Sequence, residues 1–511
     1  MSFPPPRRGM RVRSDPAAPQ DDHWDCNTRL ALASLALIAF ALRLLPVFVF
    51  PSIDYPDEIF QTIEQAHRLA FGYGVVPWEF EYGSRSWMLP GALAGLIELS
   101  RPFGEGPGVY VPFVGAALAA LSSAAALCGA LWGRRFFGLT GMAVAGLAAA
   151  VSIDAVYFGP RTLSEAVAAH LLVIGLYLAV PGDATPGRLR LVVGGLVLGL
   201  AAMTRIQLAP AILAIAAWPS AAAYRRRLPP LLGGAAIAVL ASGALDAATW
   251  GSPFASTWRN FAVNVFDGAA AANGVAPWHG YGDMLMDAWG AGVVVAVLLL
   301  ALIGARRLPH LVVAAAVILA SHSLIGHKEY RFVYPAILLL VLSSGLGLAQ
   351  LTAWAIEALA RQRPGARWNG FACGAMALGF PVLVSLGEST SPAYRELWTR
   401  GHAALRGADF IARLPSVCGI GSFGLHWTKS AGYAHFHRRV PTYWPENDER
   451  LFRKTKPAFN VLLYSRRPAG AKEFVDASCV DGVCVAIRRG RCVAMPTRPS
   501  EPGPTVGGIS P

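Results

Sequence analysis

The feature that most constrains this chain is a series of apolar runs, each close to the length that crosses a lipid bilayer. A transmembrane helix needs about 20 predominantly apolar residues. Charged residues make up only 15% of the 511 residues, whereas a soluble domain carries about 25%. A membrane β-barrel would instead show short segments of alternating hydrophobicity. The sequence therefore predicts an α-helical polytopic membrane protein.

Eleven apolar segments are candidate spans. They are 30–50, 109–132, 139–158, 162–180, 189–203, 207–221, 229–247, 288–303, 311–325, 332–351 and 371–386. If the N-terminus is cytosolic, every second connection should be rich in Arg and Lys. These connections contain GRRFFG, PGRLR, YRRRLPP, ARRLPH and ARQRPGARW, and all five are basic. The agreement requires a break at MTRIQLAP, and interrupted spans of this kind line cavities.

The domain organisation follows from this topology. We expect a disordered cytosolic tail (1–28), a transmembrane domain (29–388) with a first extracytosolic loop (51–107), a small extracytosolic α/β domain (389–495) and a disordered tail (496–511). The net charge of +13 lies mainly at the ends of apolar runs, which argues against nucleic-acid binding.

The last domain carries four cysteines in a compartment where disulfides can form. They are Cys418, Cys479, Cys484 and Cys492. Four cysteines allow three pairings, and the sequence does not choose among them.

An acidic pair opens the first extracytosolic loop. Asp57 and Glu58 follow Pro56, and residues 59–71 have helical periodicity. One of the two acids would therefore lie at a helix N-terminus near the membrane surface. The alternative is that the acid only caps the helix.

The same loop mixes aromatic and charged residues, including Trp78, Glu79, Arg85 and Trp87. Aromatic rings can stack on a pyranose face while carboxylates hold sugar hydroxyls, so the mixture suits a sugar site. The alternative for the tryptophans is the aromatic belt at the membrane interface.

A compact charged cluster, HKEYR, follows a span on the same side of the membrane. His327, Lys328 and Arg331 would together bind a phosphate, with Lys as a point charge and Arg as a planar fork. The alternative is a positively charged loop end, which the positive-inside rule disfavours on this side.

Three arginines also lie where that rule does not expect them: Arg43, Arg161 and Arg205. Each can meet an anionic head group, or pair with an internal carboxylate such as Glu165 or Asp246.

A further extracytosolic loop carries Trp278 and His279 in NGVAPWHGYGD. They are candidate sugar contacts, and ordinary loop packing is the alternative. The histidines show no zinc spacing, so we expect no metal, and no phosphate-binding glycine loop lies in a suitable context.

These segments together resemble glycosyltransferase family 22, which includes the mannosyltransferases of GPI-anchor and asparagine-linked glycan assembly. The loop YPDEIFQTIEQAHRLAFGYGVVPWEFEYGSRSWMLPG is similar to the family's HPDE-x-x-Q, GxG and T-W-E-W-like stretches. HKEYRF resembles its H-K-E-x-R-F motif, and LDAATWGSP with APWH resembles its D-x-x-x-Y-G and H-P-W-H-W-Y stretches. Tyr55 replaces the usual His before PDE, PWHGYG lacks the second Trp, and the region after Glu388 matches nothing in the family.

The resemblance implies a GT-C type bundle of about 11 spans and an inverting transferase that uses a polyprenyl-phosphate sugar, mannose by family. On this basis we expect Asp57 to be the general base, with Glu58 positioning the acceptor or replacing it as base. His327, Lys328 and Arg331 would hold the donor phosphate, with Arg205 and Arg161 as weaker candidates. Trp78, Glu79 and Arg85 would line the acceptor side, and Trp278 and His279 would contact the donor.

The expected partners are the lipid-linked sugar, a glycan or glycolipid acceptor and membrane lipids, with no cofactor. The alternatives are a GT-C transferase for another lipid-linked sugar, or a carrier that binds polyprenyl phosphate without chemistry. The Arg-rich, Lys-poor composition suggests a GC-rich bacterial genome, hence an inner-membrane enzyme whose site faces the periplasm.

Overall fold

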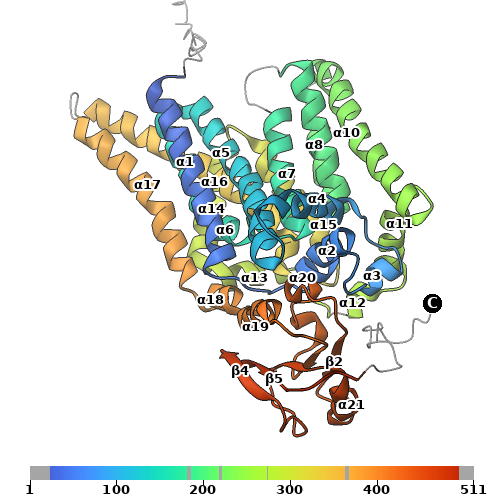
Figure 1. Cartoon of the computed structure of the whole chain (residues 1–511). Coiled ribbons are helices and arrows are strands. Elements are labelled where there is room, and N and C mark those ends of the chain that lie inside the picture. The colour runs from blue at the N-terminus through green and yellow to red at the C-terminus, as the bar shows by residue number, and fades with distance from the viewer. Residues whose placement is uncertain (1–23, 181–185, 218–220, 273, 363–366, 494–511) are drawn as a thin grey trace, which may run out of the picture.

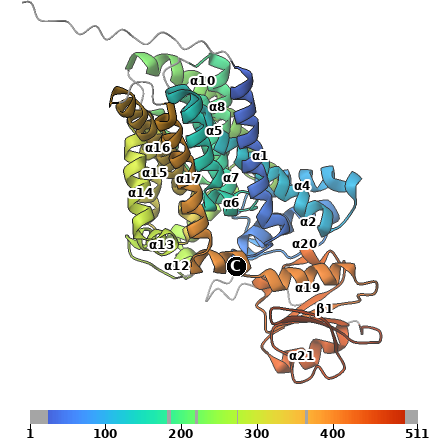
Figure 2. The ribbon, with the colours of Figure 1, turned by 90° about the vertical axis from the view of Figure 1, so that its left-hand side faces the viewer.

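The computed structural model describes residues 24–180, 186–217, 221–272, 274–362 and 367–493. Its helices form a bundle that stands above a small sheet domain (Figures 1 and 2). Residues 1–23 and 496–511, which make up nearly all of the two predicted disordered tails, lie outside the described residues.

Each predicted span overlaps a helix of the bundle. The bundle helices are α1 (Cys26–Phe48), α5 (Pro107–Val151), α6 (Ile153–Phe158), α7 (Ser164–Ala179), α8 (Arg188–Thr204), α9 (Ala209–Ala216), α10 (Ala221–Trp250), α14 (Ala291–Gly304), α15 (Pro309–Ser323), α16 (Tyr334–Gln362) and α17 (Arg367–Ser389). Five described stretches are long and apolar enough to cross a membrane by themselves, and α14 with the helix before it makes a sixth, bent by 108°. The chain is thus a multi-pass membrane protein, and eleven crossings stay a prediction.

Helix α5 contains one predicted span (109–132) and most of the next (139–158), which continues into α6, and Gly138 separates the two at the basic connection GRRFFG. Gly138 has φ +65° and ψ −153°, a conformation that glycine adopts without steric cost. The two halves then pack so closely that a Cβ on Gly133 would lie 2.2 Å from the carbonyl oxygen of Gly141. The pair therefore forms a tight helical hairpin.

The predicted break at MTRIQLAP is present. Helix α8 ends at Thr204, Arg205 is extended (φ −145°, ψ 94°), and a short turn leads into α9. An interrupted helix frees backbone polar groups and redirects the chain, which is tolerated where the segment borders a cavity. The break places Arg205 at the end of α8 rather than on a continuous helix face.

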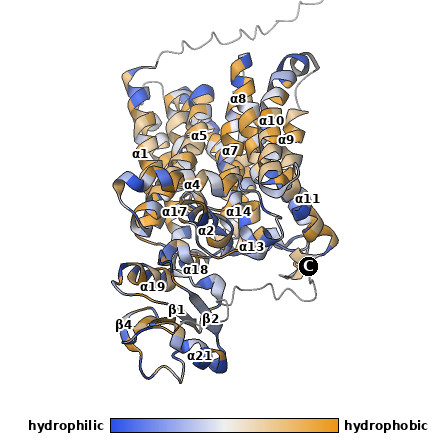
Figure 3. Cartoon of the chain, turned by 45° about the vertical axis from the view of Figure 1, so that its right-hand side comes forward, coloured by the Kyte–Doolittle hydropathy of each residue, from blue (hydrophilic) through white to orange (hydrophobic). Residues whose placement is uncertain are grey.

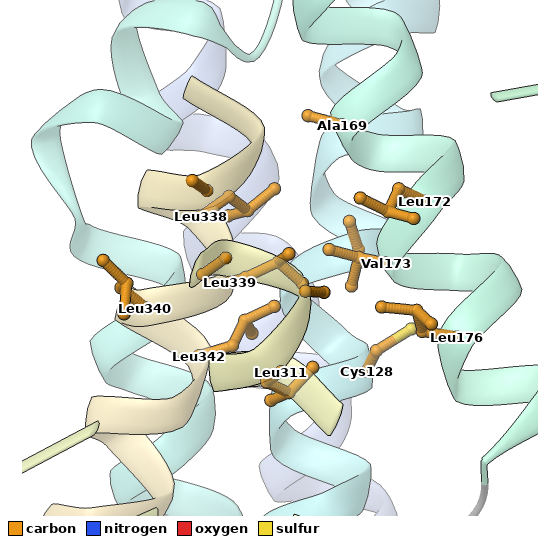
Figure 4. Close-up of a cluster of buried hydrophobic side chains, with 14 of the residues drawn as sticks. Cys128, Ala169, Leu172, Val173, Leu176, Leu311, Leu338, Leu339, Leu340 and Leu342 are labelled. Carbon is orange, nitrogen blue, oxygen red and sulfur yellow. The ribbon is translucent and has the colours of Figure 1, made fainter. Parts of the chain in front are cut away.

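The core of the bundle is apolar and lies where α5, α7, α15 and α16 meet. Figure 4 shows Leu339 and Leu342 of α16 facing Leu172 and Leu176 of α7, with Leu311 of α15 below them. The bundle helices are coloured mainly as hydrophobic, whereas the helices of the sheet domain carry more hydrophilic residues (Figure 3). The core holds the polar ends of the helices in fixed relative positions.

Short helices fill the long loops that the sequence predicts to be extracytosolic. The first loop holds a π-helical turn (Ile59–Ile63), α2 (Glu64–Phe71), α3 (Trp78–Glu81) and α4 (Met88–Ser100), and a later loop holds α11 (Ala255–Phe261), α12 (Ala269–Ala272) and α13 (Gly280–Trp289). The helix predicted over 59–71 is therefore present, and Asp57 and Glu58 lie in its first turn. Helices α2 and α4 lie beside the bundle, above the sheet domain (Figure 2).

The C-terminal part is a small α/β domain, as predicted. Its elements are α18 (Pro392–Thr399), α19 (His402–Arg413), α20 (Tyr433–Phe436), α21 (Glu449–Thr455), β1 (Ile420–Phe423), β2 (Thr442–Glu446), β3 (Val461–Tyr464), β4 (Val475–Val480) and β5 (Val483–Ile487). The strand order is β2-β1-β3-β5-β4; β1 is parallel to β2 and β3, and β5 is antiparallel to β3 and β4. The structure selects one of the three cysteine pairings, Cys418–Cys492 with Cys479–Cys484.

The sheet domain is fastened to the first loop through α2. The buried Glu64 carboxylate accepts hydrogen bonds from the backbone N–H groups of Tyr433 (3.2 Å) and Ala434 (2.7 Å) at the start of α20. His67, one turn further along α2, contacts His437 at 3.1 Å. A hydrogen-bonded carboxylate satisfies backbone donors that would otherwise be buried without partners, so the loop and the domain form one packed unit.

Candidate active site

A cavity of about 100 Å³ lies between the first loop, the start of α7 and the break after α8. Four charged side chains line it: Asp57, Arg85, Glu165 and Arg205. Most of its other lining residues are Ser, Thr, Asn or Gln, and the rest are apolar. Carboxylates and guanidiniums thus share one cavity at one end of the bundle.

Asp57 is held by an arginine from the HKEYR segment. Arg331 Nη2 donates a 2.6 Å hydrogen bond to Asp57 Oδ2, across 274 residues of sequence. The Arg331 side chain is 6% exposed, whereas that of Asp57 is 31% exposed. Glu329 holds the same guanidinium from the other side, at 2.8 Å from Nε. The arginine is therefore a buried support, and the Asp57 carboxylate is the more accessible member of the pair.

Glu165 connects the two arginines of this region. Arg205 Nη1 lies 3.1 Å from Glu165 Oε1, and Arg331 Nε lies 3.9 Å from the same oxygen. The sequence left open whether Arg205 meets an anion or an internal carboxylate, and the structure pairs it with Glu165. Within the described part of the chain, however, the buried Arg205 Nε has no hydrogen-bond partner. Arg205 thus retains a free donor although its charge is partly balanced.

Glu58 faces a different arginine from its neighbour Asp57. Both Arg161 and Glu58 are buried, with 3.4 Å between Arg161 Nη1 and Glu58 Oε1, and Arg161 also donates to Ser52. Burial raises the pKa of Glu58 to about 7, against the opposing effect of Arg161. The pair borders a second cavity, between α1, α5 and α19. The structure therefore does not place Arg161 or Glu58 with Arg205 and Asp57.

His327 and Lys328 do not line the first cavity. Lys328 is 7% exposed, and its Nζ donates to the carbonyl oxygens of Ile325 and Ala276 (3.3 Å). His327 Nε2 lies 2.9 Å from Glu329 Oε1. Of the three basic residues predicted to hold a phosphate, the structure brings Arg331 to the acid and uses the other two to brace the segment around it.

On the acceptor side of the prediction, the structure places Arg85 on the wall of the cavity. Glu79 accepts a 2.7 Å hydrogen bond from Gln61, which also lines the cavity, and burial raises the pKa of Glu79 to about 7. Trp78 is half-buried on α3 and is not part of the lining. Trp87 packs against Trp250 (ring centroids 6.2 Å apart).

Trp278 and His279 lie apart from the cavity. Trp278 is 76% exposed, and His279 forms an exposed 2.8 Å pair with Asp283. The structure does not bring either residue to the acids.

From the sequence, Glu165 and Asp246 were expected only as possible ion-pair partners of the arginines. Glu165 lines the cavity, and the signal was an acid at the start of an apolar helix. Asp246 instead accepts hydrogen bonds from Ser256 (N, 2.9 Å; Oγ, 2.6 Å), which fixes the start of α11.

In the described ranges, no group of three or more His, Cys, Asp or Glu side chains is arranged to hold a metal.

The fold resembles that of a solved membrane glycosyltransferase. The structure of ArnT from Cupriavidus metallidurans bound to undecaprenyl phosphate aligns with a TM-score of 0.58 and 12% identity, covering 90% of this chain and 97% of that one. The helical bundle thus has the GT-C fold.

The sequence identifies the family within that class. The model of the Alg9-like mannosyltransferase family matches residues 34–386, and the chain belongs to this family. GPI alpha-1,2-mannosyltransferase 3 of Danio rerio is 25% identical over 374 residues (68% of this chain, 65% of the relative). GPI mannosyltransferase 3 of Eremothecium gossypii is 36% identical over 171 residues (30% and 28%). That of Drosophila melanogaster is 41% identical over 70 residues (14% and 12%). The chain therefore matches less than two thirds of the length of each of these relatives.

Proposed function

We propose that this protein is an inverting mannosyltransferase that takes mannose from a polyprenyl-phosphate donor and transfers it to a glycan or glycolipid on the extracytosolic membrane face. The observation that carries the proposal is the cavity in which Asp57, held by Arg331, lies with the partly unpaired Arg205. Transfer from a lipid phosphate requires a carboxylate to deprotonate the acceptor hydroxyl and a cation to stabilise the leaving phosphate, and this cavity holds both. Family membership supports mannose as the sugar.

In this proposal Asp57 is the general base. The acceptor hydroxyl oxygen attacks the anomeric carbon, its proton passes to a carboxylate oxygen of Asp57, and the bond from that carbon to the phosphate oxygen breaks. The bonding electrons leave with the phosphate, so inversion follows from attack on the opposite face. General-base catalysis contributes roughly 10²–10⁴ in rate. Arg331 fixes the carboxylate in place through Oδ2.

The leaving phosphate gains negative charge, and we assign Arg205 to it. Its unpaired Nε and its position at the break after α8 support this role. Fixed cations in a cavity that excludes water stabilise developing charge without reorganisation. Arg85 and Gln61, on the same cavity wall, are our candidates for holding the acceptor. His327 and Lys328 act in this scheme by holding the HKEYR segment rather than by direct contact. The scheme includes no cofactor.

We further propose a bacterial inner-membrane location with the cavity facing the periplasm. The support is the Arg-rich, Lys-poor usage and the basic connections on the opposite side. The relatives reported above come from animals and a fungus, so the bacterial origin rests on the composition and the side of the cavity on the basic connections.

A transfer assay with purified protein in detergent tests the function. It offers polyprenyl-phosphate-mannose, and separately a nucleotide-linked mannose, with a crude lipid and glycan extract as acceptor. We expect transfer from the lipid donor alone, lost in Asp57→Ala and retained in Glu81→Gln, an exposed acid of the same loop. Transfer of another lipid-linked sugar would correct the donor. Tight binding of polyprenyl phosphate without transfer of any lipid-linked sugar would favour a carrier and overturn the proposal.

A further inference from the structure

Another buried acid, which does not line the first cavity, lies at the centre of a hydrogen-bond network. Asp154 of α6 is 2% exposed. Its Oδ1 accepts hydrogen bonds from the hydroxyl groups of Tyr330 (2.9 Å) and Tyr394 (2.7 Å), and its Oδ2 accepts one from Trp289 Nε1 (2.9 Å). The three donors come from three different segments of the chain.

The network provides hydrogen-bond donors for the buried carboxyl group of Asp154. A carboxyl group buried among apolar side chains destabilises a fold unless its oxygens are hydrogen-bonded. The donors Trp289 and Tyr394 belong to a buried apolar cluster with Ile153, against which Tyr330 packs. Because the acid needs these donors, it holds their segments in one arrangement, and satisfied buried networks are rigid for this reason.

One of the three donors belongs to the HKEYR segment. Tyr330 and Arg331 are the first two residues of a single 3₁₀ turn (Tyr330–Val333). The Tyr330 hydroxyl bonds to Asp154, while the next side chain, Arg331, bonds to Asp57. Fixing one end of so short a turn fixes the direction of the adjacent guanidinium.

The second tyrosine belongs to the connection between bundle and sheet domain. Tyr394 lies on α18, the helix after α17, and is fully buried. Six residues later Arg400 forms an ion pair with Asp54 of the first loop. Asp154 thus accepts hydrogen bonds from two tyrosines with different neighbours. Tyr330 lies next to the proposed catalytic pair, and Tyr394 lies next to the connection between the bundle and the sheet domain.

We infer that Asp154 is a positioning residue, which holds Tyr330 and through it sets Arg331 against Asp57. This inference rests on the proposed function, since it gives the Asp57–Arg331 pair a catalytic purpose. Asp154 does not line the cavity, and we expect it to keep the base, Asp57, in its reactive position. Misplacement of a reacting group by about 1 Å can reduce a rate by roughly 10²-fold.

The chain offers a matched pair of variants. Tyr330→Phe and Tyr394→Phe each remove one hydroxyl that donates to the same oxygen, Asp154 Oδ1. We expect similar reductions in melting temperature for both. We expect Tyr330→Phe to lower kcat by roughly 10-fold to 100-fold with KM for the acceptor little changed, and Tyr394→Phe to keep kcat near that of the wild type. Asp154→Asn, which retains an acceptor oxygen, should keep more activity than Asp154→Ala.

Equal losses of activity in the two tyrosine variants, in step with their melting temperatures, would show that the network is only structural. An unchanged kcat in Tyr330→Phe would also overturn the inference.

Hydrogen exchange separates this inference from the proposed function. If the wild-type protein transfers no sugar, the proposed function fails, but exchange can still be measured. Faster exchange of residues 325–335 in Tyr330→Phe, and not in Tyr394→Phe, would support the positioning role of Asp154. Identical exchange of this segment in both variants would overturn it.

Discussion

Asp57 and Glu58 are neighbours in the chain, yet their carboxylates contact different arginines and border different cavities. Asp57 accepts a 2.6 Å hydrogen bond from Arg331, and Glu58 lies 3.4 Å from Arg161. Consecutive residues in the first turn of a helix point in directions about 100° apart, which explains why the two acids of the PDE motif meet different arginines. We therefore expect Asp57 to act as the base and Glu58 to have a structural role.

The first prediction follows from that separation. Asp57→Asn should lower transfer by roughly 10²–10⁴-fold with little effect on melting temperature, because the side chain is only partly buried. Glu58→Gln should reduce transfer by much less, because burial raises the pKa of Glu58 to about 7 and an amide resembles the protonated acid. Initial rates and thermal unfolding of both variants check this. A greater loss of transfer in Glu58→Gln than in Asp57→Asn would reverse the assignment.

The second prediction concerns Arg205. Arg205→Gln should weaken binding of polyprenyl phosphate by about tenfold or more, because a hydrogen bond to a charged group contributes roughly 1.5–3 kcal/mol. Arg101→Gln, in which the lost arginine is exposed and pairs with Glu98, is the matched control and should bind normally. A titration of detergent-solubilised protein with the lipid phosphate gives both affinities.

The loss of Arg205 also leaves Glu165 with a weaker partner, Arg331 at 3.9 Å. The melting temperature of Arg205→Gln should therefore fall, and the double variant Arg205→Gln with Glu165→Gln should recover part of it. Weak lipid binding that is restored in the double variant would mean that the arginine acts only by supporting the fold.

The third prediction compares the two disulfides of the sheet domain. Cys418–Cys492 closes a separation of 74 residues and Cys479–Cys484 one of 5. In the chain-entropy description the stabilisation grows with loop length, to about 4 kcal/mol for the long loop and about 2 kcal/mol for the short one. Replacing both cysteines of a pair by serine should therefore lower the melting temperature more for the long-range pair. Equal or reversed losses would show that the loop-length argument does not hold in this domain.

The fourth prediction concerns pH and the contact between first loop and sheet domain. Burial lowers the pKa of His67 to about 4, below the value of about 6.5 expected in an unfolded chain. The folded state therefore prefers neutral His67. Its contribution to stability is present above pH 6.5 and is lost as pH falls from about 6.5 towards 4, at up to about 1.4 kcal/mol per pH unit.

Thermal unfolding of the wild type and of His67→Gln between pH 7.5 and 5 measures this contribution. Glu64, on the same helix, acts in the opposite direction, because burial raises its pKa to about 7 and its stabilisation is lost as pH rises through 7. Only the difference between the two proteins isolates His67, and it should shrink on acidification. His279→Gln, at an exposed position, should follow the wild type, and a wild-type curve parallel to that of His67→Gln would contradict the prediction.

Much of the architecture could be predicted because insertion of a helix into a bilayer depends on the length and hydrophobicity of a single continuous segment. Each predicted span overlaps a helix, and the interruption at Arg205 is visible as a polar break between two short apolar runs. The helix after Pro56 and the small α/β domain were also predictable from periodicity and composition.

The candidate site was predictable only as residue types. The sequence indicated the acids of the first loop and the basic cluster HKEYR, but it treated His327, Lys328 and Arg331 as equivalent. In the structure Arg331 reaches the acid, while Lys328 bonds to carbonyl oxygens of its own surroundings. The direction of each side chain within a turn decides which member of a charged cluster faces a cavity. The pattern of residue types does not contain that information.

The sequence by itself thus determined that this chain lies in a membrane as a bundle of helices, with acids and cations in the loops between them, because hydrophobic run length and charge position are local properties. Only the tertiary structure decided the pairings. Arg331 meets Asp57 across 274 residues, Arg205 meets Glu165 rather than standing free, and Cys418 pairs with Cys492. These contacts depend on how helices distant in the chain pack together, and that packing is settled by the complementary shapes and buried polar groups of the whole bundle.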